Sequence, residues 1–117
     1  MIRLREALNR IADNSSVRLA SMLSADGFLI ECSEGANEKD QMVLAATCEL
    51  IGLAGRMGKE LDAGHCRSIV LRFDPSSVLI EAIEPDMIVA TILADEENID
   101  DIRSKIKNNA AQLRQCT

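Results

Sequence analysis

The chain has 117 residues, which suits one domain, and we expect residues 1–117 to form a single folded unit. Its composition, with 47% hydrophobic and 27% charged residues, is that of a globular protein and excludes a disordered chain. A net charge of −6 and only two aromatic residues, both Phe, argue against binding to nucleic acids or acidic membranes, because such binding needs basic patches.

A short helix and a β-hairpin are the first elements that the sequence predicts. Apolar residues recur at three- and four-residue spacing over residues 3–13, which indicates an amphipathic helix. Apolar runs at 17–24 and 27–33 then flank a tight turn that contains Asp26 and Gly27. Asp-Gly is favoured where both central residues of a hairpin turn have positive φ. We therefore expect two strands joined by a turn of this kind.

A long helix is predicted over residues 38–61. Asn37 is a suitable N-cap, and Glu38 and Asp40 place negative charge in the first turn, where the helix dipole favours it. Because successive residues of a helix are turned by about 100°, one set of apolar residues falls on a single face, which should pack on a sheet. Its members are Val43, Ala46, Thr47, Leu50, Ala54, Met57 and Leu61.

A second face of this helix is also apolar, and its side chains are small. Its members are Leu44, Ala45, Cys48, Ile51, Gly52 and Gly55. A helix that is apolar over most of its circumference needs cover on more than one side, so we expect a partner protein here. Glycine inside a helix costs about 1 kcal/mol relative to alanine, and close approach of another backbone would compensate for that cost. The alternative is that this face packs under a loop of the same chain.

Three short strands and a final helix complete the predicted order. The strands span residues 67–73, 77–83 and 87–93, and turns that contain proline separate them. The third run has no polar alternation, which predicts a central strand covered on both faces. The first run contains two arginines and is predicted to be an edge strand. With a helix at about 97–114, the order is αββαβββα and the fold class is α+β.

No residue pattern predicts catalysis, a metal site or a cofactor. The four cysteines are Cys32, Cys48, Cys66 and Cys116. They lack the close spacing of a zinc site or a redox motif. His65 and Cys66 are adjacent, so in a strand their side chains point to opposite faces and are poorly placed to share a proton. The sequence contains no glycine-rich phosphate-binding motif.

The acidic residues have structural explanations. Glu31, Glu81 and Glu84 are expected at solvent-facing strand or turn positions. Acidic residues at 95–97 and 100–101 open the final helix, where the helix dipole favours negative charge. The alternative for these last residues is contact with a basic surface of a partner.

The N-terminus shows no secretory signal. Arg3, Arg5 and Glu6 interrupt the region where such a signal would need an uncharged apolar run. Disulfides are typical of oxidising compartments, which a chain without a signal does not enter. We therefore expect a cytoplasmic protein with reduced thiols.

Residues 23–30, with the sequence LSADGFLI, are similar to the first hairpin of the roadblock/dynein light-chain superfamily. In that family an apolar strand meets an Asp-Gly turn and then a second apolar strand. The long helix rich in small residues, the three strands with short turns and the amphipathic last helix follow in the family's order. The resemblance covers nearly the whole chain, from Leu4 to Leu113.

This resemblance implies a five-stranded antiparallel sheet with helices on both faces. The long helix would cover one face, and the first and last helices would cover the other. Members of the family dimerise by pairing the third strand of each sheet edge to edge while their long helices pack antiparallel. On this basis the dimer interface would contain the second face of the long helix together with Ser68, Val70 and Arg72 of the third strand.

The function that the resemblance implies is that of a non-catalytic interaction module. Single-domain bacterial and archaeal members regulate small Ras-like GTPases, so we expect a homodimer that binds such a GTPase. A heterodimer with a related chain would bury the same surfaces. One alternative is a small-molecule sensor of profilin-like fold, which would need an internal pocket with converging polar groups. Another is a structural subunit of a larger assembly.

Overall fold

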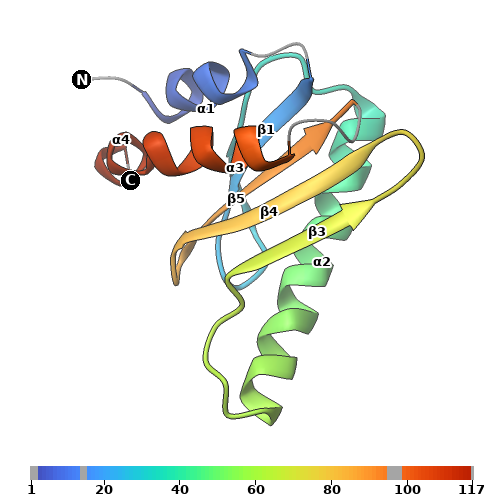
Figure 1. Cartoon of the computed structure of the whole chain (residues 1–117), viewed down its shortest axis with the longest axis vertical. Coiled ribbons are helices and arrows are strands. Elements are labelled where there is room, and N and C mark those ends of the chain that lie inside the picture. The colour runs from blue at the N-terminus through green and yellow to red at the C-terminus, as the bar shows by residue number, and fades with distance from the viewer. Residues whose placement is uncertain (1–2, 14–15, 95–98, 117) are drawn as a thin grey trace.

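The computed structural model of the chain describes residues 3–13, 16–94 and 99–116 (Figure 1). Helices and strands occupy the positions that the hydrophobic patterns predict, within a few residues at each end. The elements are α1 (Leu4–Ala12), β1 (Val17–Leu23), β2 (Leu29–Cys32), α2 (Glu38–Glu60), β3 (Ser68–Arg72), β4 (Ser77–Glu84), β5 (Met87–Leu93), α3 (Ile99–Asn108) and α4 (Ala110–Gln115).

The five strands form one antiparallel sheet in the order β2-β1-β5-β4-β3. This arrangement confirms the expected five-stranded antiparallel sheet and the α+β class. Strand β5, the run without polar alternation, lies at the centre and is buried along nearly its whole length. Strand β3, the run with two arginines, lies at an edge, as predicted.

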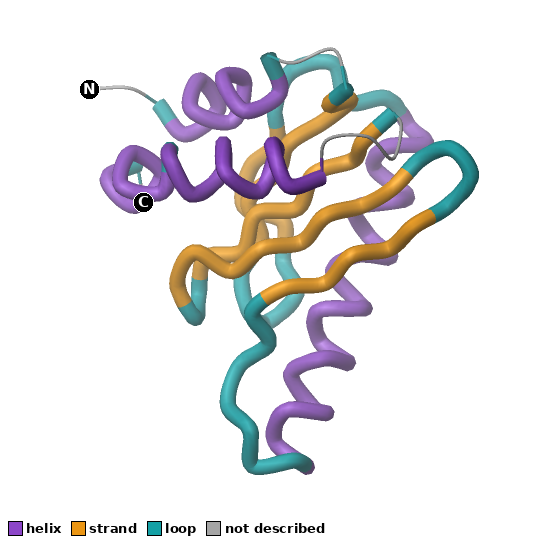
Figure 2. The backbone as a smooth tube through the Cα atoms, viewed as in Figure 1, coloured by secondary structure: helices purple, strands orange, loops and turns teal. Residues whose placement is uncertain are grey.

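Helices cover both faces of the sheet, so the molecule has three layers (Figures 1 and 2). On β4, Leu79 faces the core beneath α1, α3 and α4, whereas Val78 and Ile80 face α2. This alternation follows from the two-residue period of a strand, because both faces of the sheet are buried. The long helix therefore covers one face and the first and last helices cover the other, as the resemblance implies.

The start of α2 is fixed by polar contacts to the sheet. The Asn37 side chain accepts a hydrogen bond from the backbone N–H of Asp40 at 2.8 Å, and Asp40 accepts one from Asn37 at 3.1 Å, forming a capping box. Arg18 of β1 donates to both carboxylate oxygens of Asp40, at 2.9 and 2.8 Å. The predicted N-cap is thus confirmed, and an ion pair holds it against β1.

Two local predictions were wrong. In the hairpin turn only Gly27 has positive φ, at 86°, and its N–H donates to the Ser24 carbonyl at 3.0 Å. Asp26 therefore does not share the left-handed conformation that the Asp-Gly pattern predicted. The last helix is interrupted at Asn109, whose side-chain amide donates to the Lys105 carbonyl at 2.7 Å and competes with helical hydrogen bonding. The predicted acidic start at 95–97 lies outside the described residues.

Candidate interaction surface

Helix α2 packs on the sheet through parts of both predicted faces, because Thr47 of the expected sheet face is buried together with two residues of the second face. Leu44 and Ile51, assigned to a partner contact, are only 2% and 6% exposed and pack against the chain's own sheet. Val43, Met57 and Leu61, assigned to the sheet, are 38%, 63% and 71% exposed. Both faces are apolar, so hydrophobicity alone does not distinguish them.

The exposed side of α2 forms a continuous apolar stripe, which we name the α2 flank. Its members recur at three- and four-residue spacing and are Val43, Ala46, Leu50, Leu53, Met57 and Leu61. Leu50 is half-buried and the others are exposed. Large exposed apolar patches on a protein usually mark interaction sites, so the α2 flank is a candidate interface.

The N-terminal half of the α2 flank faces the β3–β4 hairpin. A groove of about 400 Å³ separates the helix from the β3–β4 hairpin. Val43, Ala46 and Leu50 line it from the helix side, and Leu71 and Phe73 line it from the hairpin. Phe73 is 55% exposed, and the groove is open at the surface. The apolar stripe and the edge strand therefore lie on the same side of the molecule.

The structure places the remaining predicted helix residues away from this side. Ala45 is exposed, and Cys48 is half-buried beside the sheet, where burial raises the pKa of its thiol. Gly52 and Gly55 line a separate cleft of about 800 Å³ beside the β1–β2 loop. A Cβ added to either glycine would meet no atom within 4 Å outside its own helical turns, so no other part of the described chain closely approaches them.

The β3 edge leaves backbone hydrogen-bonding groups open. Arg67 accepts a hydrogen bond from Ala82 at 2.9 Å, and Phe73 donates to Ser76 at 2.7 Å, so residues 67 and 73 point their backbone groups toward β4. In an antiparallel ladder this direction alternates along the strand. The predicted edge residues point their N–H and C=O groups outward, and they are Ser68, Val70 and Arg72. No described strand adjoins this outer side of β3.

The opposite edge, β2, is protected by polar side chains. Glu31 accepts hydrogen bonds from the Cys32 backbone N–H and from Arg5, each at 3.0 Å. The bond from Cys32 and then the one from Arg5 hold the pKa of Glu31 below its ordinary value. Asn9 of α1 accepts from the Glu34 N–H at 2.8 Å. Such contacts hinder the addition of another strand, so β3 is the more open of the two edges.

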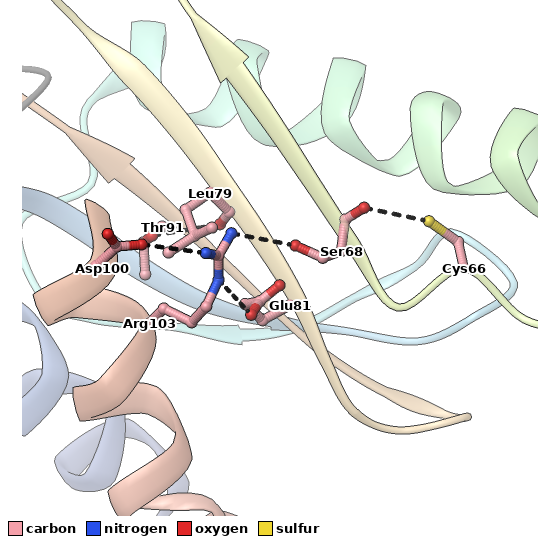
Figure 3. A network of polar contacts seen from close by, with 7 residues as sticks. All are labelled: Cys66, Ser68, Leu79, Glu81, Thr91, Asp100 and Arg103. Carbon is pink, nitrogen blue, oxygen red and sulfur yellow. Dashed lines mark hydrogen bonds and ion pairs between the residues drawn. The ribbon is translucent and has the colours of Figure 1, made fainter.

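A polar network connects α3 to the β3–β4 edge (Figure 3). Arg103 donates to Glu81 at 2.8 Å, to Asp100 at 3.3 Å and to Ser68 at 3.5 Å. The expectation that Glu81 faces solvent was wrong, because α3 covers it and leaves it 6% exposed. Its second carboxylate oxygen, Oε2, is buried without a hydrogen-bond partner among the described residues.

The other residues considered for chemistry are dispersed. His65 and Cys66 are exposed in the loop between α2 and β3, and the Cys66 thiol donates to the Ser68 carbonyl at 3.7 Å. Glu84 pairs with Arg114 on the far side of the sheet from α2. Within the described ranges, no three His, Cys, Asp or Glu side chains gather as metal ligands. No described helix has both the length and the apolar character to span a bilayer.

Comparison with solved structures shows the same architecture elsewhere. A Roadblock/LC7 domain from Streptomyces avermitilis has a TM-score of 0.81 at 16% identity, with 97% of each chain covered. MglB from Myxococcus xanthus has a TM-score of 0.78 at 13% identity, with 96% of this chain and 92% of that chain covered. The gliding protein MglB from Thermus thermophilus has a TM-score of 0.78 at 13% identity, with 97% and 87% covered.

Sequence comparison identifies the family. No protein of curated function matches the chain significantly. The profile of the Roadblock/LC7 domain matches residues 4–94, which include all five strands and the long helix. The Roadblock/LC7 family is a family of regulatory and interaction domains. The chain belongs to the Roadblock/LC7 domain family.

Proposed function

We propose that this chain is a non-catalytic interaction module that forms a homodimer and binds a small Ras-like GTPase, whose nucleotide cycle it modulates. The observation that carries the proposal is the position of the α2 flank beside the open β3 edge. Membership of the family supports the GTPase as the class of partner. The cytoplasm, where such GTPases act, is the expected location.

A two-fold axis perpendicular to the sheet accounts for both exposed features at once. It would join the two β3 strands antiparallel into one continuous sheet and place both α2 helices on the same face. The two α2 flanks would then meet across the axis and bury their apolar side chains. In this dimer the interface residues of β3 remain Ser68, Val70 and Arg72, and the interface residues of α2 are those of the α2 flank. Leu44 and Ile51 support it from beneath, as part of each chain's own core.

The proposed effect on the GTPase is a shift in its conformational populations. A partner can bias a protein only toward a state that it binds more tightly. The dimer would therefore act by binding one arrangement of the GTPase switch loops better than the other. Arg5, Arg18 and Arg103 are bound to carboxylates within the chain, and we assign no catalytic arginine.

The test is to measure nucleotide exchange and GTP hydrolysis by the Ras-like GTPases of the same organism, with and without the chain. We expect the wild-type protein to change at least one of these rates. Met57→Asp places a carboxylate on the α2 flank and should abolish the effect by preventing dimer formation. Ala45→Asp places the same carboxylate at an exposed position on the other side of α2 and should leave the effect unchanged. Absence of binding to every such GTPase would contradict the GTPase assignment.

A second candidate function, a subunit of a larger assembly, is favoured by a separate apolar patch. Phe28, Leu29 and Ile30 are 68%, 45% and 48% exposed at the β2 edge. This edge lies at the opposite end of the sheet from β3, so it would stay free in the proposed dimer. One structural neighbour is described as MglB with tetrameric arrangement. Masses above that of a dimer, reduced by Phe28→Ser, would support this function.

A further inference from the structure

We propose that the two β3 strands pair about Val70, and that Arg72 of each copy forms an ion pair with Glu81 of the other copy. The inference rests on the proposed homodimer and adds its register and a specific contact between the subunits. It starts from the outward-pointing backbone groups of β3 and from the unpartnered carboxylate oxygen of Glu81.

The register follows from the strand's length and its hydrogen-bonding alternation. Only residues that point their backbone groups outward can form hydrogen-bonded pairs with a second strand. In β3 these are Ser68, Val70 and Arg72. A two-fold axis at Val70 pairs Val70 with its own copy and Ser68 with Arg72 in both directions, so all three residues are used. An axis at Ile69 or Leu71 leaves one end of the strand without a partner.

This register brings Arg72 of one copy near Glu81 of the other. Ser68 is directly opposite Glu81 in the β3–β4 ladder, and both side chains lie on the α3 side of the sheet (Figure 3). Arg72 of the second copy would be opposite Ser68 on that same side. Only β3 then separates its strand from β4, so the backbones of the two residues lie two strand spacings, about 9.6 Å, apart, which the long side chains of arginine and glutamate can span.

The carboxylate of Glu81 has room for a second donor. Glu81 and Asp100 share one guanidinium, that of Arg103, which donates to Oε1 of Glu81 and leaves Oε2 without a partner among the described residues. Arg72 is exposed and forms no ion pair with the described residues. The Oε2 atom of Glu81 is covered in the single chain, but the terminal torsion of a glutamate is soft and can turn this oxygen toward the edge. A buried carboxylate oxygen without a partner is costly, so an added donor is favourable.

Two further cations lie close to Glu81 and could compete with Arg72 of the second copy for its carboxylate. Arg67 and Lys107 border the cleft that contains Glu81. Neither makes an ion pair within the described chain. Arg67 precedes β3, and its backbone groups point toward β4. It supplies the matched control, because it is an exposed arginine beside the same carboxylate but outside the paired strand.

The experiment mixes two variants, Arg72→Met and Glu81→Gln, and measures the heterodimer fraction by native mass spectrometry with one chain carrying a mass tag. Neither variant's homodimer retains an Arg72–Glu81 pair, whereas the heterodimer retains one. If each pair strengthens association about fivefold, the heterodimer should reach about 80% of all dimers instead of the statistical value of about 50%. A contact within one chain cannot produce this excess.

A second measurement covers the case in which Glu81→Gln fails to fold, because Arg103 depends on it. In an otherwise wild-type chain, Arg72→Met removes both pairs and should weaken the dimer about 25-fold, whereas Arg67→Met should leave the dissociation constant unchanged. A wild-type dimer with a heterodimer fraction of about 50%, or with equal effects of the two arginine variants, overturns the ion pair and leaves the proposed function standing. A wild-type chain that stays monomeric overturns both.

Discussion

At the scale of single residues, Gly58 has a different role from the other glycines of α2. A Cβ at Gly58 would lie 2.3 Å from the backbone oxygen of Gly64, in the loop that leads to β3. A Cβ at Gly52 or Gly55 would meet nothing within 4 Å. Gly58 thus allows the chain to turn back closely against the end of α2, whereas the other two glycines have no such constraint within one chain.

We therefore expect opposite effects of alanine at two of these positions. Gly58→Ala should lower the free energy of unfolding by about 1–3 kcal/mol, because the backbone atom that it meets cannot move as a side-chain tip can. Gly52→Ala, the matched control, should raise it by about 0.5–1 kcal/mol through helix propensity. Urea unfolding followed by circular dichroism checks both. If Gly52→Ala destabilised the protein, another backbone would lie close to Gly52, as the sequence predicts.

Glu31 provides a test by pH. Its pKa is lowered in the folded chain, chiefly by the hydrogen bond from the Cys32 N–H and then by Arg5. A group whose pKa is lowered on folding stabilises the protein above its unfolded pKa, which is about 4.3 for glutamate, and this contribution is lost as the pH falls through the folded pKa. The wild type should be more stable than Glu31→Gln at pH 7, and the difference should shrink as the pH falls through the folded pKa of Glu31.

Denaturant unfolding of both proteins across this pH range measures the effect. The variant serves as the reference for all other titrating groups, because it differs only at this position. A difference in stability that is constant with pH would mean that the charge of Glu31 does not contribute to the free energy of unfolding.

At the scale of elements, most of the fold could be predicted from the sequence, but the rotation of α2 could not. Hydrophobic period and turn residues locate the helices and strands, because each element must bury one or both of its faces. On α2 two sides are apolar, so the hydrophobic period does not show which of them faces the sheet. The ion pair from Arg18 to Asp40 sets the rotation, and it joins residues 22 positions apart. Asp40, Leu44 and Ile51 then line up toward the sheet.

The position of Glu81 was equally hidden in the sequence. On an antiparallel strand with one solvent-facing side, a glutamate marks that side. On β4 both sides are covered, and the carboxylate is tolerated because Arg103 from α3 pairs with it. That contact joins residues 22 positions apart, so no local sequence pattern predicts it. The β3 residues, in contrast, were placed correctly on an edge, because two arginines in a short strand favour exposure.

The register of the β3 pair can be checked by disulfide cross-linking. With Cys66 replaced by Ser, Val70→Cys should form a disulfide between copies under mild oxidation, because Cα atoms of a hydrogen-bonded antiparallel pair are about 5.5 Å apart. Ile69→Cys, the neighbouring control, should not, because in this register Ile69 is opposite Leu71 of the other copy. Non-reducing gel electrophoresis shows the product. Faster cross-linking through Ile69 would move the axis and contradict the Arg72–Glu81 contact.

At the scale of the whole molecule, the shape of the chain argues for a second copy. The C-terminal half of α2 extends beyond the sheet, where no other layer of the described chain lies over its outer side (Figures 1 and 2). Leu53, Met57 and Leu61 of the α2 flank are 48%, 63% and 71% exposed there. A single chain gains nothing from this apolar stripe. Two copies would bury the apolar stripe and the open β3 edge in one interface.

The first property to measure is the solution mass of the wild-type chain, by light scattering over a range of protein concentrations, because it shows whether the homodimer forms. We expect twice the chain mass of 12.8 kDa, maintained down to the low micromolar range. We also expect Met57→Asp to reduce this mass to that of one chain and Ala45→Asp to leave it unchanged. A wild-type protein with the mass of a single chain at all concentrations would contradict the homodimer and leave the α2 flank to a different partner.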